Sequence, residues 1–251
     1  MAIDLLKIGS FTIHGYGLMI GFGFLAAILI ACYRARKVGL NDDFIFNMAI
    51  FTLVFGWMGG KLLFIIVEFK NFLSNPLGIL GSSGFVVYGG IISGILTIFI
   101  YSKIKKINFF DYIDIIAPSV SVNQAFGRVG CFMAGCCYGR VTDSKIGVIF
   151  PENSLAPAGV RVLPTQLFSA VGDALIFFLL IMYAKRKPKK GMVTALYLML
   201  YAVGRFLIEF LRDDDRGTVG ILSTSQFISL IMFVVSIGLI LFIQKKKGSG
   251  K

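Results

Sequence analysis

The sequence has few charged residues and almost no histidine. Charged residues make up 15% of its 251 residues, and there are 13 acidic side chains and one histidine. A soluble globular domain carries about 25% charged residues, so the shortage argues against a soluble protein. No histidine lies near the cysteines at positions 131, 136 and 137, which argues against a mixed cysteine and histidine zinc site.

Long apolar stretches make up much of the sequence. Hydrophobic residues make up 57% of the chain, and the mean hydropathy is +0.84. A helix needs about 20 apolar residues to cross a bilayer core of roughly 30 Å. We therefore predict an all-α integral membrane protein, a single polytopic domain over residues 1–251 with an external loop at about 128–163. Its seven transmembrane helices are expected at residues 15–33, 44–67, 84–101, 110–127, 164–184, 192–211 and 221–243.

The fourth predicted helix is the most polar of the seven. Lipid-exposed polar groups are costly, so a segment of this kind is tolerated only where protein or a water-filled cavity shields it. We expect this helix to carry functional side chains. The residues that interrupt it are Asp111, Asp114, Pro118, Ser119, Ser121, Asn123 and Gln124.

The net charge of +12 is concentrated in four basic clusters. They lie at residues 34–37, 103–106, 185–190 and 245–247, after the first, third, fifth and seventh predicted helices. Basic loops stay on the cytoplasmic side, so the pattern predicts an external N-terminus and a cytoplasmic C-terminus. It does not predict a nucleic-acid partner.

Two arginine motifs fall near the predicted outer face. Arg205 and Glu209 are four residues apart and share one helix face, where they form either a structural ion pair or part of an anion site. Arg128 lies between Gly127 and Gly130, where backbone amides can approach an anion closely. Because guanidinium groups bind phosphate through paired hydrogen bonds, we predict a phospholipid phosphate site.

Eight short motifs, spread over nearly the whole chain, carry a resemblance to a known family. They are YGLM at 16–19, GKL at 60–62, YGG at 88–90, Asp114 with AP at 117–118, GRVGCF at 127–132, PTQL at 164–167, GRFLIEFLR at 204–212 and LSTSQ at 222–226. In this order they resemble the prolipoprotein diacylglyceryl transferase family.

The resemblance implies an activity. Members move the diacylglyceryl group of phosphatidylglycerol to the lipobox cysteine thiol of preprolipoproteins, release glycerol 1-phosphate, and so begin lipoprotein lipidation. We therefore expect a multi-pass enzyme of the bacterial cytoplasmic membrane with its active site toward the outer leaflet, and no metal or organic cofactor. The expected partners are phosphatidylglycerol and preprolipoprotein signal peptides.

The motifs also imply roles for individual residues. We expect the catalytic residues to be Arg128, Arg205, Tyr88 and Glu209. Phospholipid-binding residues are expected to be Arg128, Arg205, Arg212, Tyr16, Lys61, Asn123 and Gln166. His14 is a candidate base, because it is the one histidine in the chain.

The sequence departs from the family pattern at several polar positions. Tyr88, Cys131, Cys136, Leu163 and Ser169 stand where the family has His, Asn, Glu, His and Glu. The identity of the thiol base is therefore open. Two alternatives to the transferase remain: a phospholipid-binding relative that is non-catalytic or has another acceptor, and a transporter that uses the Arg205 and Glu209 pair.

The cysteines of the glycine-rich stretch allow several interpretations. The spacing of Cys131, Cys136 and Cys137 does not match common zinc-ligand spacing, and adjacent cysteines cannot bond one another without strain. We expect them to pack as small side chains in a tight turn. A disulfide to Cys131, a metal site and a covalent relay are the alternatives.

Overall fold

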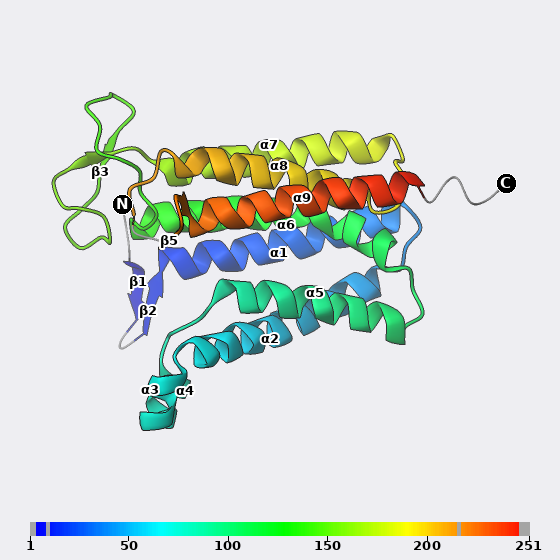
Figure 1. Cartoon of the computed structure of the whole chain (residues 1–251), viewed down its shortest axis with the longest axis horizontal. Helices are drawn as coiled ribbons and strands as arrows, with labels where there is room; N and C mark the ends of the chain where they lie inside the picture. The colour runs from blue at the N-terminus through cyan, green and yellow to red at the C-terminus, as the bar shows by residue number, and fades with distance from the viewer. Residues whose placement is uncertain (1–3, 9–10, 215–216, 246–251) are drawn as a thin grey trace. The chain divides into compact units, whose positions relative to one another are not determined.

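The computed structural model describes residues 4–8, 11–214 and 217–245. The chain is mostly helical (Figure 1). The helices are α1 (Gly15–Lys37), α2 (Asp42–Val67), α3 (Phe69–Ser74), α4 (Pro76–Gly81), α5 (Val87–Ile104), α6 (Phe109–Ala134), α7 (Thr165–Lys185), α8 (Met192–Glu209) and α9 (Thr224–Lys245).

Short antiparallel hairpins add to this helical frame, and the sequence did not predict them. They pair β1 (Asp4–Ile8) with β2 (Phe11–His14), β3 (Val148–Ile149) with β4 (Arg161–Val162), and β5 (Thr218–Val219) with β6 (Leu222–Ser223). Four of the six strands have only two residues, too few for an alternating sequence pattern to show.

Six of the described helices are long and apolar enough to cross a membrane: α1, α2, α5, α7, α8 and α9. An all-α, multi-pass membrane protein fits these helices. The predicted fourth segment lies within α6, which is a helix of 26 residues but is not one of the six. Its polar residues are the reason, and a seventh crossing stays a prediction.

Basic residues occupy the last turns of several of these helices. Arg36 and Lys37 lie in the last turn of α1, and Lys103, Lys185 and Lys245 lie in the last turns of α5, α7 and α9. Lys246 and Lys247 of the predicted fourth cluster lie outside the described residues. The clusters follow the helices as the sequence predicts, while the side of the membrane that they face stays a prediction.

The described residues divide into two compact units. One comprises the residues up to Ile30 and from Ile113 onward, and the other comprises Ala31–Tyr112. In the first unit, the axes of α6, α7, α8 and α9 lie roughly along one line, and the chain direction alternates from one helix to the next (Figure 1). A buried apolar cluster that includes Ala117, Leu180 and Tyr197 joins α6, α7 and α8.

Polar contacts fix α6 within this unit. The Asp114 carboxylate accepts hydrogen bonds from the Gly191 and Thr194 amides at 2.6 and 2.8 Å, and so binds the amino end of α8. The Ser121 hydroxyl donates to the Asp173 carbonyl of α7 at 2.7 Å. Since these polar groups have protein partners, α6 satisfies much of its polarity inside the unit.

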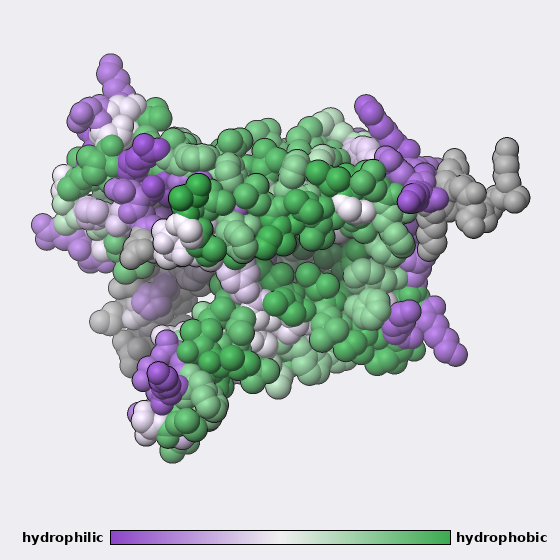
Figure 2. All heavy atoms as spheres, in the orientation of Figure 1, coloured by the Kyte–Doolittle hydropathy of each residue, from purple (hydrophilic) through white to green (hydrophobic). Residues whose placement is uncertain are grey.

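The outer faces of the same helices are apolar. Leu175, Phe178, Leu207 and Val234 are each more than half exposed, at 57%, 59%, 59% and 67%. Figure 2 shows hydrophobic side chains along α7, α8 and α9 and hydrophilic ones toward the helix ends. Such a surface is unfavourable in water and suits a lipid environment.

In the second unit, α2 and α5 pack closely through glycines. A Cβ atom on Gly59 would lie 2.8 Å from the Gly89 carbonyl oxygen, so any larger residue there would separate the two helices. This agrees with the close helix contacts expected of small residues in membranes. Lys61 of α2 is buried in this unit, and its ammonium donates to the Ser82 carbonyl at 2.7 Å and the Gly84 carbonyl at 3.4 Å.

Candidate active site

The first unit contains a cavity of about 260 Å³ between α6, α7 and α8. Arg128 of α6 and Arg205 of α8 both line it, although they are far apart in the sequence. The other lining residues are Phe168, Ser169, Gly172, Asp173, Ile176, Tyr201, Gly204, Leu207, Ile208 and Leu211. Two guanidinium groups therefore meet in a small and otherwise largely apolar space.

Arg205 is oriented by polar side chains around it. Its Nη1 lies 2.8 Å from Glu209 Oε2, four residues later on α8, and its Nη2 donates to the Ser225 hydroxyl at 2.7 Å. Glu209 in turn accepts a hydrogen bond from Ser223 at 2.8 Å. The side chains of Arg205 and Glu209 are only 10% and 6% exposed, so the pair is largely desolvated.

The ion pair leaves hydrogen-bonding capacity unused. Arg205 Nη1 and Glu209 Oε2 are close but poorly aligned, and neither has a hydrogen-bond partner among the described residues. Buried polar atoms normally have such partners, so an unsatisfied pair needs an explanation. A ligand in the cavity could provide one.

Arg128 has still fewer contacts. Across the described ranges it has neither a hydrogen-bond partner nor an ion-pair partner, and the Asp173 carboxylate acts on it only through longer-range electrostatics. Arg128 is partly buried, and a guanidinium that is withdrawn from water without a hydrogen-bond partner is costly, so proteins rarely keep one without a function. The guanidinium of Arg128 is thus available to an anion that enters the cavity.

Sequence reasoning missed two polar residues of this cavity, Asp173 and Tyr201. Asp173 is buried, 5% exposed, and interacts electrostatically with Arg128 and Arg205. One signal was available, because a lone acidic residue in an otherwise apolar helix such as α7 is expensive in a membrane. Tyr201 precedes Arg205 by four residues and so shares its helix face.

Arg212 lies just beyond α8 and has partners of its own. It forms two hydrogen bonds of 2.8 Å to the Asp214 carboxylate. Burial lowers the pKa of Arg212, but hydrogen bonds with Asp214 and Cys137 outweigh burial and raise the pKa above its usual value. Arg212 is not among the residues that line the cavity.

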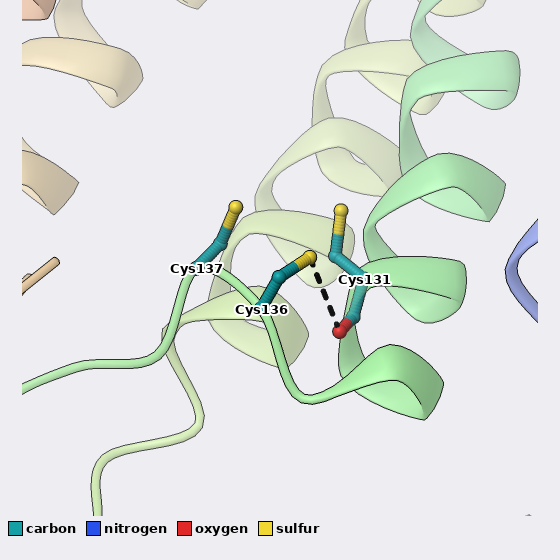
Figure 3. A group of neighbouring side chains, drawn as sticks. All are labelled: Cys131, Cys136 and Cys137. Atoms are coloured by element: carbon teal, nitrogen blue, oxygen red, sulfur yellow. Dashed lines mark hydrogen bonds between the residues drawn. The ribbon is translucent and has the colours of Figure 1, made fainter. Parts of the chain in front are cut away.

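The cysteines gather where α6 ends (Figure 3). The Sγ atoms of Cys131, Cys136 and Cys137 all lie within 4.8 Å of one another. Hydrogen bonds with Cys131 and Cys136, together with the charge of Arg212, lower the pKa of Cys137, while hydrogen bonding to the other two thiols raises that of Cys136. Cysteine spacing in the sequence does not reveal this cluster, because it depends on the loop after α6 folding back onto the end of the helix.

The remaining predicted site residues of the first unit have structural contacts. The Tyr16 ring lies against Gly130, where an added Cβ would come within 3.2 Å of it, and Asn123 lies against Gly23 of α1. Gln166 donates to the Cys136 carbonyl at 2.7 Å. His14 is exposed at the end of β2. None of these four residues is among those that line the cavity.

Two predicted residues, Lys61 and Tyr88, belong to the second unit. Lys61 directs its ammonium at the loop that carries Ser82 and Gly84. Tyr88 lies in the first turn of α5 and is 42% exposed. Their roles in phospholipid binding and catalysis stay predictions.

Comparison with known proteins agrees with these observations. Residues 4–242 match the family model described as prolipoprotein diacylglyceryl transferase. The chain is 47% identical over 240 residues to the phosphatidylglycerol–prolipoprotein diacylglyceryl transferase of Clostridium tetani, covering 95% of both chains. It is 45% identical over 251 residues to transferase 2 of that name from Clostridium perfringens, covering 99% of this chain and 97% of the relative. The chain therefore belongs to the prolipoprotein diacylglyceryl transferase family.

Proposed function

We propose that this protein transfers the diacylglyceryl group of phosphatidylglycerol to the lipobox cysteine thiol of preprolipoproteins. The observation that carries the proposal is the convergence of Arg128 and Arg205 on one cavity in a chain of this family. Arg128 forms no hydrogen bond or ion pair with the described residues, so an anionic substrate would supply one.

The cavity is suited to a phosphate head group. Two guanidinium groups offer several N–H donors in planar arrays, and charge-assisted hydrogen bonds of this kind are roughly twice as strong as neutral ones. A space of about 260 Å³ is small for a whole phospholipid, so the acyl chains would lie outside it along apolar helix faces. Glu209 and Ser225 keep Arg205 in a fixed orientation.

In the proposed reaction the acceptor thiolate attacks C3 of the diacylated glycerol. A carbon–sulfur bond forms, the C3–oxygen bond to phosphate breaks, and the bonding electron pair leaves with the phosphate as glycerol 1-phosphate. Negative charge on that phosphate grows in the transition state, where Arg128 and Arg205 stabilise it. Removing one preorganised donor of this type costs about 3 to 4 kcal/mol of transition-state stabilisation.

Asp173 is placed to accept the thiol proton. It is the carboxylate among the residues that line the cavity, and it interacts with both arginines. A general base needs to lie within hydrogen-bond reach of the proton that it removes, and Asp173 shares the cavity in which the thiol would react. Tyr201 could orient the phosphate or thiol through its hydroxyl. His14 and Tyr88 have less geometric support as a base.

The basic clusters support a proposed topology. We propose one polytopic domain of seven spans, counting α6, with the N-terminus outside and the C-terminus in the cytoplasm. The satisfied polar groups of Asp114 and Ser121 support a crossing by α6 despite its polarity. This arrangement puts the cavity toward the outer leaflet of the bacterial cytoplasmic membrane.

A reconstituted transfer assay tests the function. Purified protein in phosphatidylglycerol vesicles is given a synthetic lipobox peptide, and the peptide mass and released glycerol 1-phosphate are measured. We expect one thioether-linked diacylglyceryl group per released glycerol 1-phosphate. A peptide with serine in place of the lipobox cysteine is the matched control and should gain no mass.

Two results would count against the proposal. A folded protein that forms no product, yet binds phosphatidylglycerol, would be a non-catalytic lipid-binding relative. Transfer to a nucleophile other than the peptide thiol would show an altered acceptor.

A further inference from the structure

The cysteine cluster has the geometry of a metal site. The three Sγ atoms lie within 4.8 Å of one another, and Figure 3 shows the three side chains grouped where α6 ends. Zinc–sulfur bonds are about 2.3 Å, so two sulfurs on one ion are separated by roughly 4 Å. Small side-chain movements would therefore bring all three sulfurs onto one ion.

The backbone that carries these thiols is held in place by α7. The Thr165 hydroxyl donates to the Cys137 carbonyl at 2.8 Å, and the Gln166 amide nitrogen donates to the Cys136 carbonyl at 2.7 Å. Both α7 residues are about 1% exposed. Such supporting contacts orient ligands in advance of metal binding.

The turn itself also brings the sulfurs together. Gly135 has a φ of +74° and Cys137 a φ of +62°, a region that a cysteine rarely adopts. The Cys136 amide donates to the Cys131 carbonyl at 3.1 Å, which folds the chain back onto the end of α6. A strained non-glycine residue that is held by buried partners is typical of a functional site.

We propose that Cys131, Cys136 and Cys137 bind a single soft metal ion, such as Zn²⁺, through three thiolates. Thiolate sulfur selects ions of this class, and three protein ligands leave a fourth zinc position open to water or another small ligand. Each thiol gives up its proton when it binds the ion. The proposal does not depend on the transferase activity.

Other roles for the cluster are less well supported. A disulfide from Cys131 would use two thiols and leave the third without a purpose. A covalent relay would place the diacylglyceryl group on cysteine as a thioether, and thiolate is a poor leaving group from such a carbon. Simple packing does not account for three thiols within 4.8 Å beside the guanidinium of Arg212.

Bound metal would have a local structural effect. It would tie the last turns of α6 to the loop that leads to β3, and Cys131 is one helical turn after Arg128. The end of α6 that carries the cavity arginine would then be more rigid.

Metal titration of the full-length protein in detergent tests the site. The protein is purified with a non-thiol reductant, stripped with a chelator and titrated with Cd²⁺, while thiolate-to-metal charge-transfer absorbance is recorded. We expect one Cd²⁺ per chain, competition by Zn²⁺, and protection of three thiols from alkylation. Each of Cys131→Ser, Cys136→Ser and Cys137→Ser should weaken binding at least tenfold.

The fourth cysteine provides the matched control. Cys32 lies in α1 and belongs to the other compact unit, so Cys32→Ser should bind Cd²⁺ like the unmodified protein. Circular dichroism and gel filtration of each variant exclude loss of binding through misfolding. If a variant unfolds, the zinc content of the unmodified protein, purified without a chelator, tests the metal site instead. We expect one zinc ion per chain.

Some results would overturn the proposal. They are absorbance changes that persist in the triple serine variant, unmodified protein that carries no zinc and takes up no Cd²⁺, or a Cys131 disulfide trapped by acid in freshly isolated membranes.

Discussion

Two cations of this protein, one buried and one partly buried, have opposite surroundings. Lys61, in the unit Ala31–Tyr112, is 8% exposed and surrounded by Ser82 and Gly84 oxygens. Arg128, in the other unit, faces a cavity and has no ion-pair or hydrogen-bond partner in the described parts of the chain. A satisfied buried cation stabilises the fold, whereas an unsatisfied one is kept for a ligand.

The comparison separates stability from function. Removing Lys61 should leave the Ser82 and Gly84 carbonyls without their donor and so weaken the fold. Removal of Arg128 should abolish ligand binding without the loss of a hydrogen bond or ion pair within the described residues. A substitution of Lys61 should therefore lower mainly the stability of the fold. A substitution of Arg128 should lower mainly the activity.

The largest effect is expected for Arg128→Ala. We expect the transfer rate to fall about 10³-fold, because one oriented donor to the leaving phosphate is removed. The melting temperature should stay the same or rise, since a partly buried charge without a hydrogen-bond partner is lost. Transfer assays and thermal unfolding in detergent measure the two effects.

Arg186→Ala is the control for that variant. Arg186 follows α7 and is exposed, so its removal should leave both quantities unchanged. If Arg128→Ala lowers the melting temperature as well as the rate, Arg128 is a structural residue. The contrast between Lys61 and Arg128 would then be wrong.

A smaller effect is expected for Asp173→Asn. The substitution preserves shape but removes the proton acceptor, and a general base contributes about 10²-fold or more. We expect the loss to appear in kcat, measured with saturating phosphatidylglycerol and peptide. Asp143→Asn, at an exposed loop position, should keep full activity.

If Asp173→Asn leaves the transfer rate unchanged, another residue is the general base. His14→Gln and Tyr88→Phe would then be the next variants to assay, since both residues remain candidates.

Glu209→Gln should have a weaker effect again. Arg205 keeps its hydrogen bond to Ser225 but loses the charge of its partner, so its orientation is less fixed. We expect a rate loss of about tenfold, because the partly desolvated ion pair that helps to orient Arg205 is lost. Initial rates of the single and double variants measure it.

The double variant sharpens this prediction. Arg205→Ala combined with Glu209→Gln should be no slower than Arg205→Ala alone, because Glu209 acts through Arg205. Additive losses would mean that Glu209 contacts substrate by itself.

The smallest effect on the rate is expected for Lys61→Met. The folded variant should retain most of its transfer rate, while its free energy of unfolding falls by about 1 to 3 kcal/mol through unsatisfied carbonyls. Denaturation in detergent and the transfer assay measure the two quantities. A large rate loss at unchanged stability would instead make Lys61 a phospholipid ligand, as its motif predicts.

Much of the fold follows from local sequence patterns. Apolar length predicts α1, α2, α5, α7, α8 and α9, since a bilayer demands a minimum helix length. The i,i+4 spacing predicts the contact of Arg205 with Glu209, which the structure confirms at 2.8 Å. These features depend on residues close together in the chain.

Local sequence patterns do not predict features that depend on residues far apart in the chain. Asp173 lines the same cavity as Arg128 and Arg205 only because three helices pack around it. The cysteine cluster depends on a left-handed turn at Gly135 and Cys137, and ligand spacing alone does not reveal such a turn. The Asp114 contact with the amino end of α8 is likewise tertiary.

The central claim is that Arg128 and Arg205 together bind the phosphate of phosphatidylglycerol. An experimental structure of the full chain with this lipid bound tests it most directly. We expect a phosphate oxygen within about 2.7 to 2.9 Å of a guanidinium nitrogen of each arginine. A phosphate bound elsewhere, with the cavity between α6, α7 and α8 closed to the head group, would contradict it.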